Sequence, residues 1–145
     1  MAEPADDATA RVKAFFEALS PADLDRLGEL YAADAHFVDP FNDVRGLIAV
    51  RGIFAHMFQT LDRPHFRVLD SFARGQQAFL TWDFHFTTKG AGARAMTIHG
   101  STHLRFGPDG RIALHRDYWD AAGELYARLP LIGAVMRWLK RRIAG

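Results

Sequence analysis

A histidine and an aspartate with complementary chemistry stand two residues apart in this sequence, at His115 and Asp117. They lie in a segment, Arg111 to Trp119, whose composition predicts a β-strand. Because side chains alternate along a strand, His115, Asp117 and Trp119 share one face. Such a cluster could bind a substrate oxygen or move a proton between a carboxylate and an imidazole. It could also be a buried pair that only satisfies its own hydrogen bonds, and both interpretations stay open.

A second candidate for proton transfer is Asp39, which precedes Pro40. The residue before a proline is biased toward an extended or turn conformation, so this carboxylate stands where the chain turns. Aspartate is a common turn former, and Asp39 could serve only to stabilise that turn. Alternatively, it faces a pocket and acts with His115 and Asp117 as an acid or base.

The seven histidines do not have the spacing of a metal site. His99 and His103 share a strand face but lie ~13 Å apart at about 3.3 Å per residue, too far to hold one ion. A site assembled from His85, His115 and Asp39 is conceivable but lacks a ligand motif. Because the chain contains no cysteine, disulfides, thiolate catalysis and zinc–thiolate sites are excluded. We therefore expect no metal and no organic cofactor.

The length and composition are those of one globular domain, and we expect it to span residues 1–145. A net charge of +1 provides no overall field that would attract nucleic acid, although residues 137–142 are locally basic. The apolar stretch from Leu129 to Val135 is far shorter than the ~20 residues of a membrane span. The segment from Met1 to Asp7 has no apolar signal region, so the expected location is the cytoplasm.

The periodicity of apolar residues predicts the elements that position the candidate groups. Helical spacing indicates three helices in the first half of the chain, near residues 6–19, from Ser20 onward, and from Leu47 to Leu61. After these, β-branched and aromatic residues predict four strands: Phe66 to Ser71, Ala78 to Thr87, Arg94 to Phe106 and Arg111 to Trp119. Helices followed by strands indicate an α+β fold, with the helices on one face of an antiparallel sheet.

One strand face is unusually aromatic, because Trp82, Phe84 and Phe86 alternate along the second predicted strand. Such a face would be an aggregation liability in water. We therefore expect it, or its register neighbours, to lie on the convex side of the sheet and to be buried in a two-fold homodimer.

The chain closes with a helix that starts near Ala121 and is broken at Pro130. Its second part carries apolar residues opposite Arg137, Lys140 and Arg141. Because Pro130 and Gly133 allow a bend, we expect the apolar residues to lie over or beside the pocket mouth as a lid. These residues are Leu129, Leu131, Ile132, Val135 and Met136.

Several motifs together resemble the ketosteroid isomerase and SnoaL-like branch of the nuclear transport factor two-like superfamily. They are Tyr31-Ala-Ala-Asp-Ala-His-Phe-Val-Asp-Pro-Phe41, Gly46, the Phe-rich third helix, and Leu104-Arg-Phe-Gly-Pro-Asp-Gly-Arg-Ile112 followed by Tyr118-Trp119. The resemblance covers nearly the whole chain. It implies a cone-shaped, curved sheet packed on three N-terminal helices around a deep pocket, and a dimer formed through the convex face.

The resemblance also assigns roles to individual positions. Asp39 falls where ketosteroid isomerases have their general base, which works with an oxyanion hole of one Tyr and one protonated Asp. Those two positions are Phe15 and Thr102 here, so steroid isomerisation by that mechanism is not expected. The residues expected to line the pocket and contact a substrate are Phe15, Tyr31, Phe37, Phe54, Phe58, Thr102 and Trp119; ordinary core packing is the alternative for the aromatic ones.

The combined prediction is acid–base chemistry on a small apolar carbonyl or hydroxyl compound, of the isomerase, dehydratase or cyclase type. Asp39, His115 and Asp117 are its expected catalytic residues. The alternative is a non-catalytic module of the same fold that binds an apolar ligand or serves in dimerisation, because this fold hosts both kinds of protein. An Asp39 carboxylate held by backbone donors, with a pocket filled by its own side chains, would favour the alternative.

Overall fold

A computed structural model describes residues 5–124 and 130–144. The N-terminal helices are α1 (Ala5–Glu17), the 3₁₀ helix η1 (Pro21–Arg26), α2 (Leu27–Leu30) and α3 (Leu47–Thr60). Helix α1 buries Ala8, Val12 and Phe16, which recur every four residues and therefore share one face. The turn into η1 is a capping box, in which Asp23 accepts a hydrogen bond from the backbone N–H of Ser20. That bond lowers the pKa of the Asp23 carboxyl.

Six strands form one sheet in the order β2-β1-β6-β5-β4-β3. Their bounds are β1 (Tyr31–Val38), β2 (Asp43–Arg45), β3 (Leu61–Arg74), β4 (Gln77–Thr88), β5 (Ala95–Phe106) and β6 (Ile112–Trp119). All neighbours are antiparallel except β1 and β6, which run parallel. The four strands expected from the sequence are β3 to β6, whereas β1 and β2 were not expected as strands.

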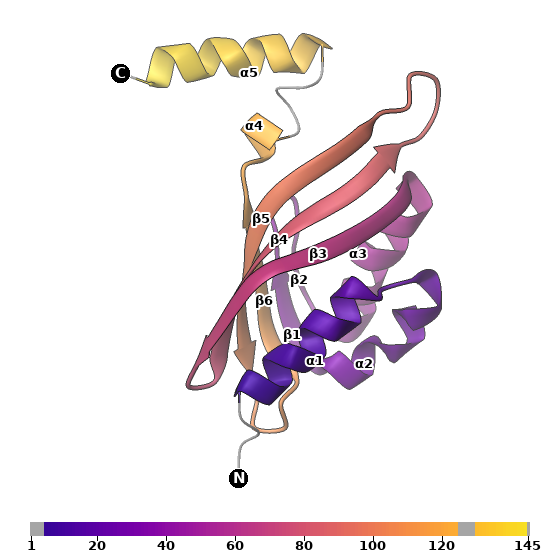
Figure 1. Cartoon of the computed structure of the whole chain (residues 1–145), viewed down its shortest axis with the longest axis vertical. Helices are drawn as coiled ribbons and strands as arrows, with labels where there is room; N and C mark the ends of the chain where they lie inside the picture. Colours follow the sequence, from indigo (N-terminus) through magenta and orange to yellow (C-terminus); the bar gives the residue numbers. More distant parts are fainter. Residues whose placement is uncertain (1–4, 125–129, 145) are drawn as a thin grey trace.

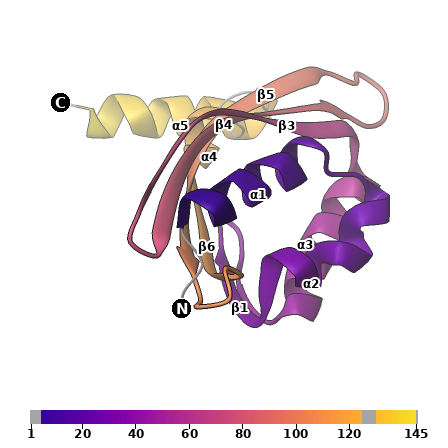
Figure 2. The ribbon, with the colours of Figure 1, turned by 60° about the horizontal axis from the view of Figure 1, so that its bottom comes forward.

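The sheet curves around the N-terminal helices and does not close, as Figures 1 and 2 show. Irregularities in pairing accompany the curvature: one lies between Val68 and Asp70 in β3, and another accompanies Ala113 in β6. Each adds a residue to one strand and bends it. The predicted α+β cone is therefore confirmed, with helices α1 and α3 inside the concave face.

Of the two alternatives for β4, the one that placed Trp82, Phe84 and Phe86 on the convex side is wrong. Trp82 and Phe86 are each only 6% exposed and belong to the core, on the concave side. The Trp82 ring meets Phe66 of β3 edge-on, and Phe84 stacks on the same Phe66. Alternation alone shows which residues share a face, but the curvature of the sheet decides which face is inside.

The outer face of the sheet carries the register neighbours of these residues. Phe72 of β3 and Phe79 of β4 are paired across the strands and are 62% and 44% exposed. Phe79 stacks on His103, whose pKa is lowered by burial and by the nearby charges of Arg105 and Arg116. A homodimer through this face stays a prediction, and its contacts would come from these outward residues.

Helices α4 (Ala121–Glu124) and α5 (Pro130–Ile143) follow the sheet. In Figures 1 and 2, α5 lies at the far end of the sheet and on the side away from α1 to α3. Val135 is 53% exposed, so the prediction of a lid over the pocket is wrong at this residue. Leu129 lies outside the described residues, as do the side chains of the other predicted lid positions. No helix among the described residues is long and apolar enough to cross a membrane.

A glycine in β5 makes room for the Trp82 ring. A Cβ atom at Gly100 would approach two ring carbons of Trp82 at 2.5 and 2.7 Å, which is closer than van der Waals contact allows. We expect Gly100→Ala to lower the free energy of unfolding by about 1–3 kcal/mol, because the ring must shift within a packed core. Urea unfolding followed by circular dichroism measures this.

The matched control is Gly52→Ala in the exposed part of α3. No atom lies within 4 Å of the added methyl group at this position. Alanine should stabilise the helix there by about 0.5–1 kcal/mol. Equal effects of the two substitutions would contradict the proposed contact between Gly100 and Trp82.

Candidate active site

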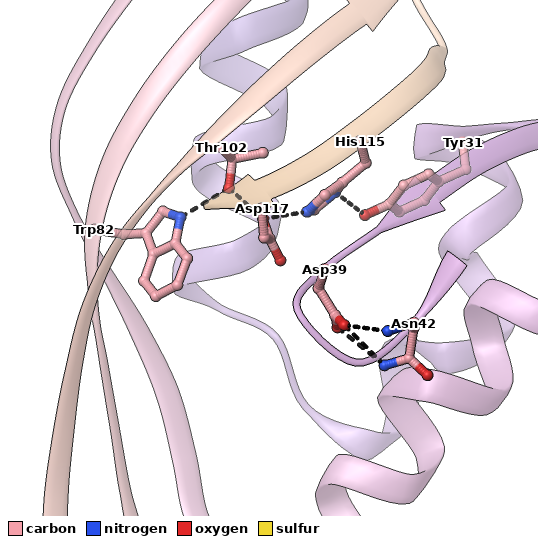
Figure 3. A network of polar contacts seen from close by, with 7 residues as sticks. All are labelled: Tyr31, Asp39, Asn42, Trp82, Thr102, His115 and Asp117. Carbon is pink, nitrogen blue, oxygen red and sulfur yellow. Dashed lines mark hydrogen bonds and ion pairs between the residues drawn. The ribbon is translucent and has the colours of Figure 1, made fainter. Parts of the chain in front are cut away.

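Four neighbouring strands bring five polar side chains into one buried chain of hydrogen bonds (Figure 3). The strands contribute Tyr31 from β1, Trp82 from β4, Thr102 from β5, and His115 and Asp117 from β6. The Tyr31 hydroxyl lies 2.8 Å from His115 Nδ1, and His115 Nε2 lies 2.7 Å from Asp117 Oδ1. Thr102 Oγ1 donates to the same Asp117 oxygen at 2.6 Å and accepts from Trp82 Nε1 at 2.8 Å.

The strand register places these groups side by side. Thr102 is the cross-strand partner of Asp117, and Leu104 is the partner of His115. The irregularity at Ala113 shifts the alternation in β6, so that Ile112 and His115 both point inward although they are three residues apart. The predicted cluster of His115 and Asp117 on one strand face is present.

The direction of each hydrogen bond follows from the donors available. An indole N–H can only donate, so Thr102 accepts from Trp82 and must give its own proton to Asp117. A carboxylate can only accept, so His115 Nε2 carries a proton toward Asp117, and in a neutral imidazole Nδ1 then accepts from the Tyr31 hydroxyl. With a neutral imidazole, a neutral phenol and a carboxylate, every proton of the network has an acceptor.

Tyr31 forms the buried end of this network. Its side chain is 0% exposed, and its ring stacks on His115 with the planes 19° apart. Burial, and secondarily the negative charge of Asp117, raise the pKa of the Tyr31 hydroxyl well above its usual value. Tyr31 therefore stays protonated and keeps the orientation of the imidazole constant.

Asp117 forms the accessible end. Its Oδ1 accepts both hydrogen bonds, whereas none of the described residues donates to Oδ2. Every buried side-chain oxygen or nitrogen among the described residues has a partner, so Oδ2 must reach accessible space. In Figure 3 this second oxygen points away from the network. Asp117 Oδ2 can thus contact a substrate while His115 and Thr102 hold Oδ1.

Two hollows share Asp117 as a lining residue. The inner pocket has about 30 Å³ of free space, enough for a water molecule or two. An open groove of about 530 Å³ lies on the other side of Asp117, where β1 ends and β6 continues. Its walls include Asp39, Pro40 and Trp119.

Asp39 is held by its own turn. Oδ1 accepts hydrogen bonds from the backbone N–H groups of Phe41 and Asn42 at 2.8 and 2.7 Å. The Asn42 side-chain amide donates to both carboxylate oxygens at 3.0 and 3.1 Å. This arrangement is an Asx turn, and it matches the structural interpretation of the Asp-Pro motif. Asp39 lines the open groove rather than the inner pocket.

Only some of the residues that were expected to line the pocket do so. Phe54 and Thr102 line the inner pocket, and Trp119 lines the groove. Tyr31 and Phe37 lie behind the pocket wall, where each contacts the His115 ring. Two further expected positions lie outside both hollows: Phe58 is half-buried against the core, and Phe15 lies beneath the Arg26 guanidinium.

Several pocket residues were not expected from the sequence. Phe16 takes the place that the resemblance gave to Phe15, because α1 buries the face that carries Phe16. The remaining wall residues missed by the sequence reasoning are Phe66, Val68, Leu80 and Trp82. Strand alternation would have identified them if the inward face of β4 had been assigned correctly.

The described residues hold no group of three or more side chains that could bind a metal ion. The metal site that was conceivable from His85, His115 and Asp39 does not form. His85 lies on the outer side of β4, stacked on His65 and bonded to Thr97, whereas His115 is buried on the inner side.

The sequence profile of the SnoaL-like domain matches residues 12–115, and the chain belongs to this family. Similar solved structures include a protein with a ketosteroid isomerase-like fold from Catenulispora acidiphila, in complex with trimethylamine (20% identity over 90% of this chain and 96% of that one; TM-score 0.70). A candidate SnoaL-like polyketide cyclase from Shewanella putrefaciens is also similar (16% identity, 85% and 97% coverage, TM-score 0.68). A candidate polyketide cyclase from Xanthomonas campestris shares 18% identity (81% and 93% coverage, TM-score 0.67). No curated protein sequence matches the chain.

Removal of the Tyr31 hydroxyl should destabilise the fold. In Tyr31→Phe, His115 Nδ1 stays buried but loses its donor, so the free energy of unfolding should fall by about 1–3 kcal/mol. Tyr118→Phe is the matched control, because Tyr118 is 52% exposed and its loss should cost less than about 0.5 kcal/mol. Chemical denaturation measures both, and equal losses would contradict the role of the Tyr31 hydrogen bond.

Alkaline pH should weaken the fold through the same residue. The pKa of Tyr31 is higher in the folded than in the unfolded protein, so unfolding favours its deprotonation. Its contribution is complete below the unfolded value of about 10 and is lost progressively as pH rises above that value. Urea midpoints measured between about pH 9 and about pH 11.5 should therefore fall more steeply for the native sequence than for Tyr31→Phe. Parallel curves would contradict this prediction.

Proposed function

We propose that this SnoaL-like protein is an acid–base enzyme in which Asp117 exchanges a proton with the substrate. The observation that carries the proposal is that the two oxygens of the Asp117 carboxylate have different surroundings. Oδ1 is held by Thr102 and His115, while Oδ2 has no donor among the described residues and is accessible. A carboxylate oriented in this way is ready to accept a proton without first reorganising its surroundings.

The reaction class follows from the groups available. Asp117 Oδ2 removes a proton from carbon or oxygen of a small apolar carbonyl or hydroxyl compound and returns it at another position. This is the chemistry of an isomerase, a dehydratase or a cyclase. His115 and Tyr31 are positioning residues, because they act on Asp117 and do not face the groove.

Steroid isomerisation by the ketosteroid isomerase mechanism is not supported. Its oxyanion hole needs two donors aimed at the substrate oxygen. Phe15 lies outside the pocket and cannot donate, and Thr102 already gives its only proton to Asp117. Asp39, the base expected from the resemblance, has one oxygen occupied by three donors.

The size of the two hollows limits how a substrate can approach. The inner pocket holds about 30 Å³, which is too little for a ring compound. The groove holds about 530 Å³ and reaches Asp117 from outside. We infer that the body of the substrate lies in the groove, between Pro40 and Trp119, with its reacting atom at Asp117.

A second candidate function is a non-catalytic module that binds an apolar ligand or serves in dimerisation. The small inner pocket and the turn-bound Asp39 favour it. In that case, the network from Tyr31 to Trp82 would only stabilise the core.

Asp117→Asn should separate the two functions. The probe is proton exchange in deuterated buffer, followed by NMR on a panel of small enolisable ketones, with turnover of lactones and epoxides tested in parallel. Asparagine keeps the size of the side chain but removes the base, so the exchange rate should fall by at least about a hundredfold.

Asp70→Asn is the matched control, because it removes an exposed carboxylate of β3 that does not line the groove. It should change the exchange rate less than threefold. An unchanged rate in Asp117→Asn would refute the role of Asp117. Binding of an apolar ligand by the native protein, without exchange or turnover of any compound in the panel, would favour the non-catalytic module.

A further inference from the structure

Helix α5 differs in charge from the rest of the chain. It contains Arg137, Lys140, Arg141 and Arg142 and no acidic residue. The whole chain has 18 basic and 17 acidic residues, so the remainder has 14 against 17 and a net charge of −3. A positively charged helix thus follows a negatively charged body.

The same helix exposes a row of apolar side chains. Val135, Leu139 and Ile143 follow each other at intervals of four residues, which places them on one face. They are 53%, 36% and 80% exposed, and Trp138 beside them is 50% exposed. The guanidinium of Arg142 lies 5.1 Å from the centre of the Trp138 ring.

The position of α5 leaves this row accessible. Figures 1 and 2 show the helix beyond the end of the sheet, on the side away from α1 to α3. A helix of 14 residues is marginal in water without a surface that covers its apolar side. Its length, about 21 Å at 1.5 Å per residue, is too short to cross a bilayer.

We propose that α5 lies in the surface of a membrane that contains anionic lipid. An apolar row of valine, leucine and isoleucine with a flanking tryptophan can enter the boundary between head groups and acyl chains. The arginines then remain at the level of the lipid phosphates, which attract them. Because the body has a net charge of −3, α5 is the part of the molecule that an anionic surface attracts.

Two other partners fit these observations less well. RNA would satisfy the arginines but leave Leu139 and Ile143 in water. A second copy of the chain brings another α5 with the same four cations, and the exposed Phe79 on the outer face of its sheet stacks on His103, next to Arg105 and Arg116. An anionic lipid surface offers negative charge and a continuous apolar phase together.

The test is flotation of the full-length protein with two kinds of vesicle. One is phosphatidylcholine alone, and the other is phosphatidylcholine mixed with phosphatidylglycerol. We expect binding to the mixed vesicles only, weakened by raised salt. The emission of Trp138 should shift to the blue on binding, and Trp138→Phe should remove most of that shift.

Two variants test the apolar and the basic contribution of α5 to membrane binding separately. Ile143→Glu acts on the most exposed residue of the apolar row and cannot disturb a packed core, and it should weaken partition at least tenfold. Arg141→Glu should weaken it by more than about fivefold, since each basic residue near the surface counts separately. Arg105→Glu is the matched control, because it makes the same change of charge on the outer face of the sheet, and it should leave partition within twofold.

Three results would overturn the proposal. The first is equal binding, or none, to the two kinds of vesicle. The second is loss of binding in Arg105→Glu to the same extent as in Arg141→Glu. The third is self-association in sedimentation that Ile143→Glu abolishes, together with no vesicle binding by the native protein.

Discussion

One carboxylate oxygen, Asp117 Oδ1, determines the arrangement of the whole polar interior. It accepts hydrogen bonds at 2.6 and 2.7 Å from Thr102 and His115, and each of these donors is in turn held by a third residue. A buried polar chain of this kind is stable only when every member is satisfied. Because Trp82 can only donate and a carboxylate can only accept, the hydrogen bonds from Thr102 and from His115 both run toward Asp117. The geometry of the candidate site therefore follows from the need of each buried donor and acceptor for a hydrogen-bond partner.

The sheet makes this arrangement possible through local irregularities. The change of register at Ala113 turns His115 inward, and the missing side chain at Gly100 admits the Trp82 ring beneath Thr102. Curvature then places these residues against Phe16 and Phe54 of the helices. The side chains fill most of the space inside the cone, so the groove beside β1, and not the interior, offers room for a ligand.

The contrast between Asp39 and Asp117 shows how two carboxylates near one groove come to differ. Asp39 stands in a tight turn, where backbone N–H groups lie within reach and occupy it. Asp117 stands in a strand, where the backbone groups are used by the sheet and side chains must supply its donors. Oδ1 of Asp117 is therefore held by Thr102 and His115, and Oδ2 stays available.

The sequence alone determined the α+β class, helices α1 and α3, strands β3 to β6 and the shared face of His115 and Asp117. These depend on local periodicity, turn residues and a resemblance that extends over most of the chain. It did not determine that Trp82 faces inward, that Phe16 replaces Phe15 in the pocket, that Asp39 is held by Asn42, or that α5 stands away from the pocket. Those outcomes depend on sheet curvature, on register shifts and on contacts between residues far apart in the chain, and none of these has a local signature. Tertiary structure alone also joined Tyr31 to His115, because a hydrogen bond across 84 positions forms only when parallel strands β1 and β6 are paired.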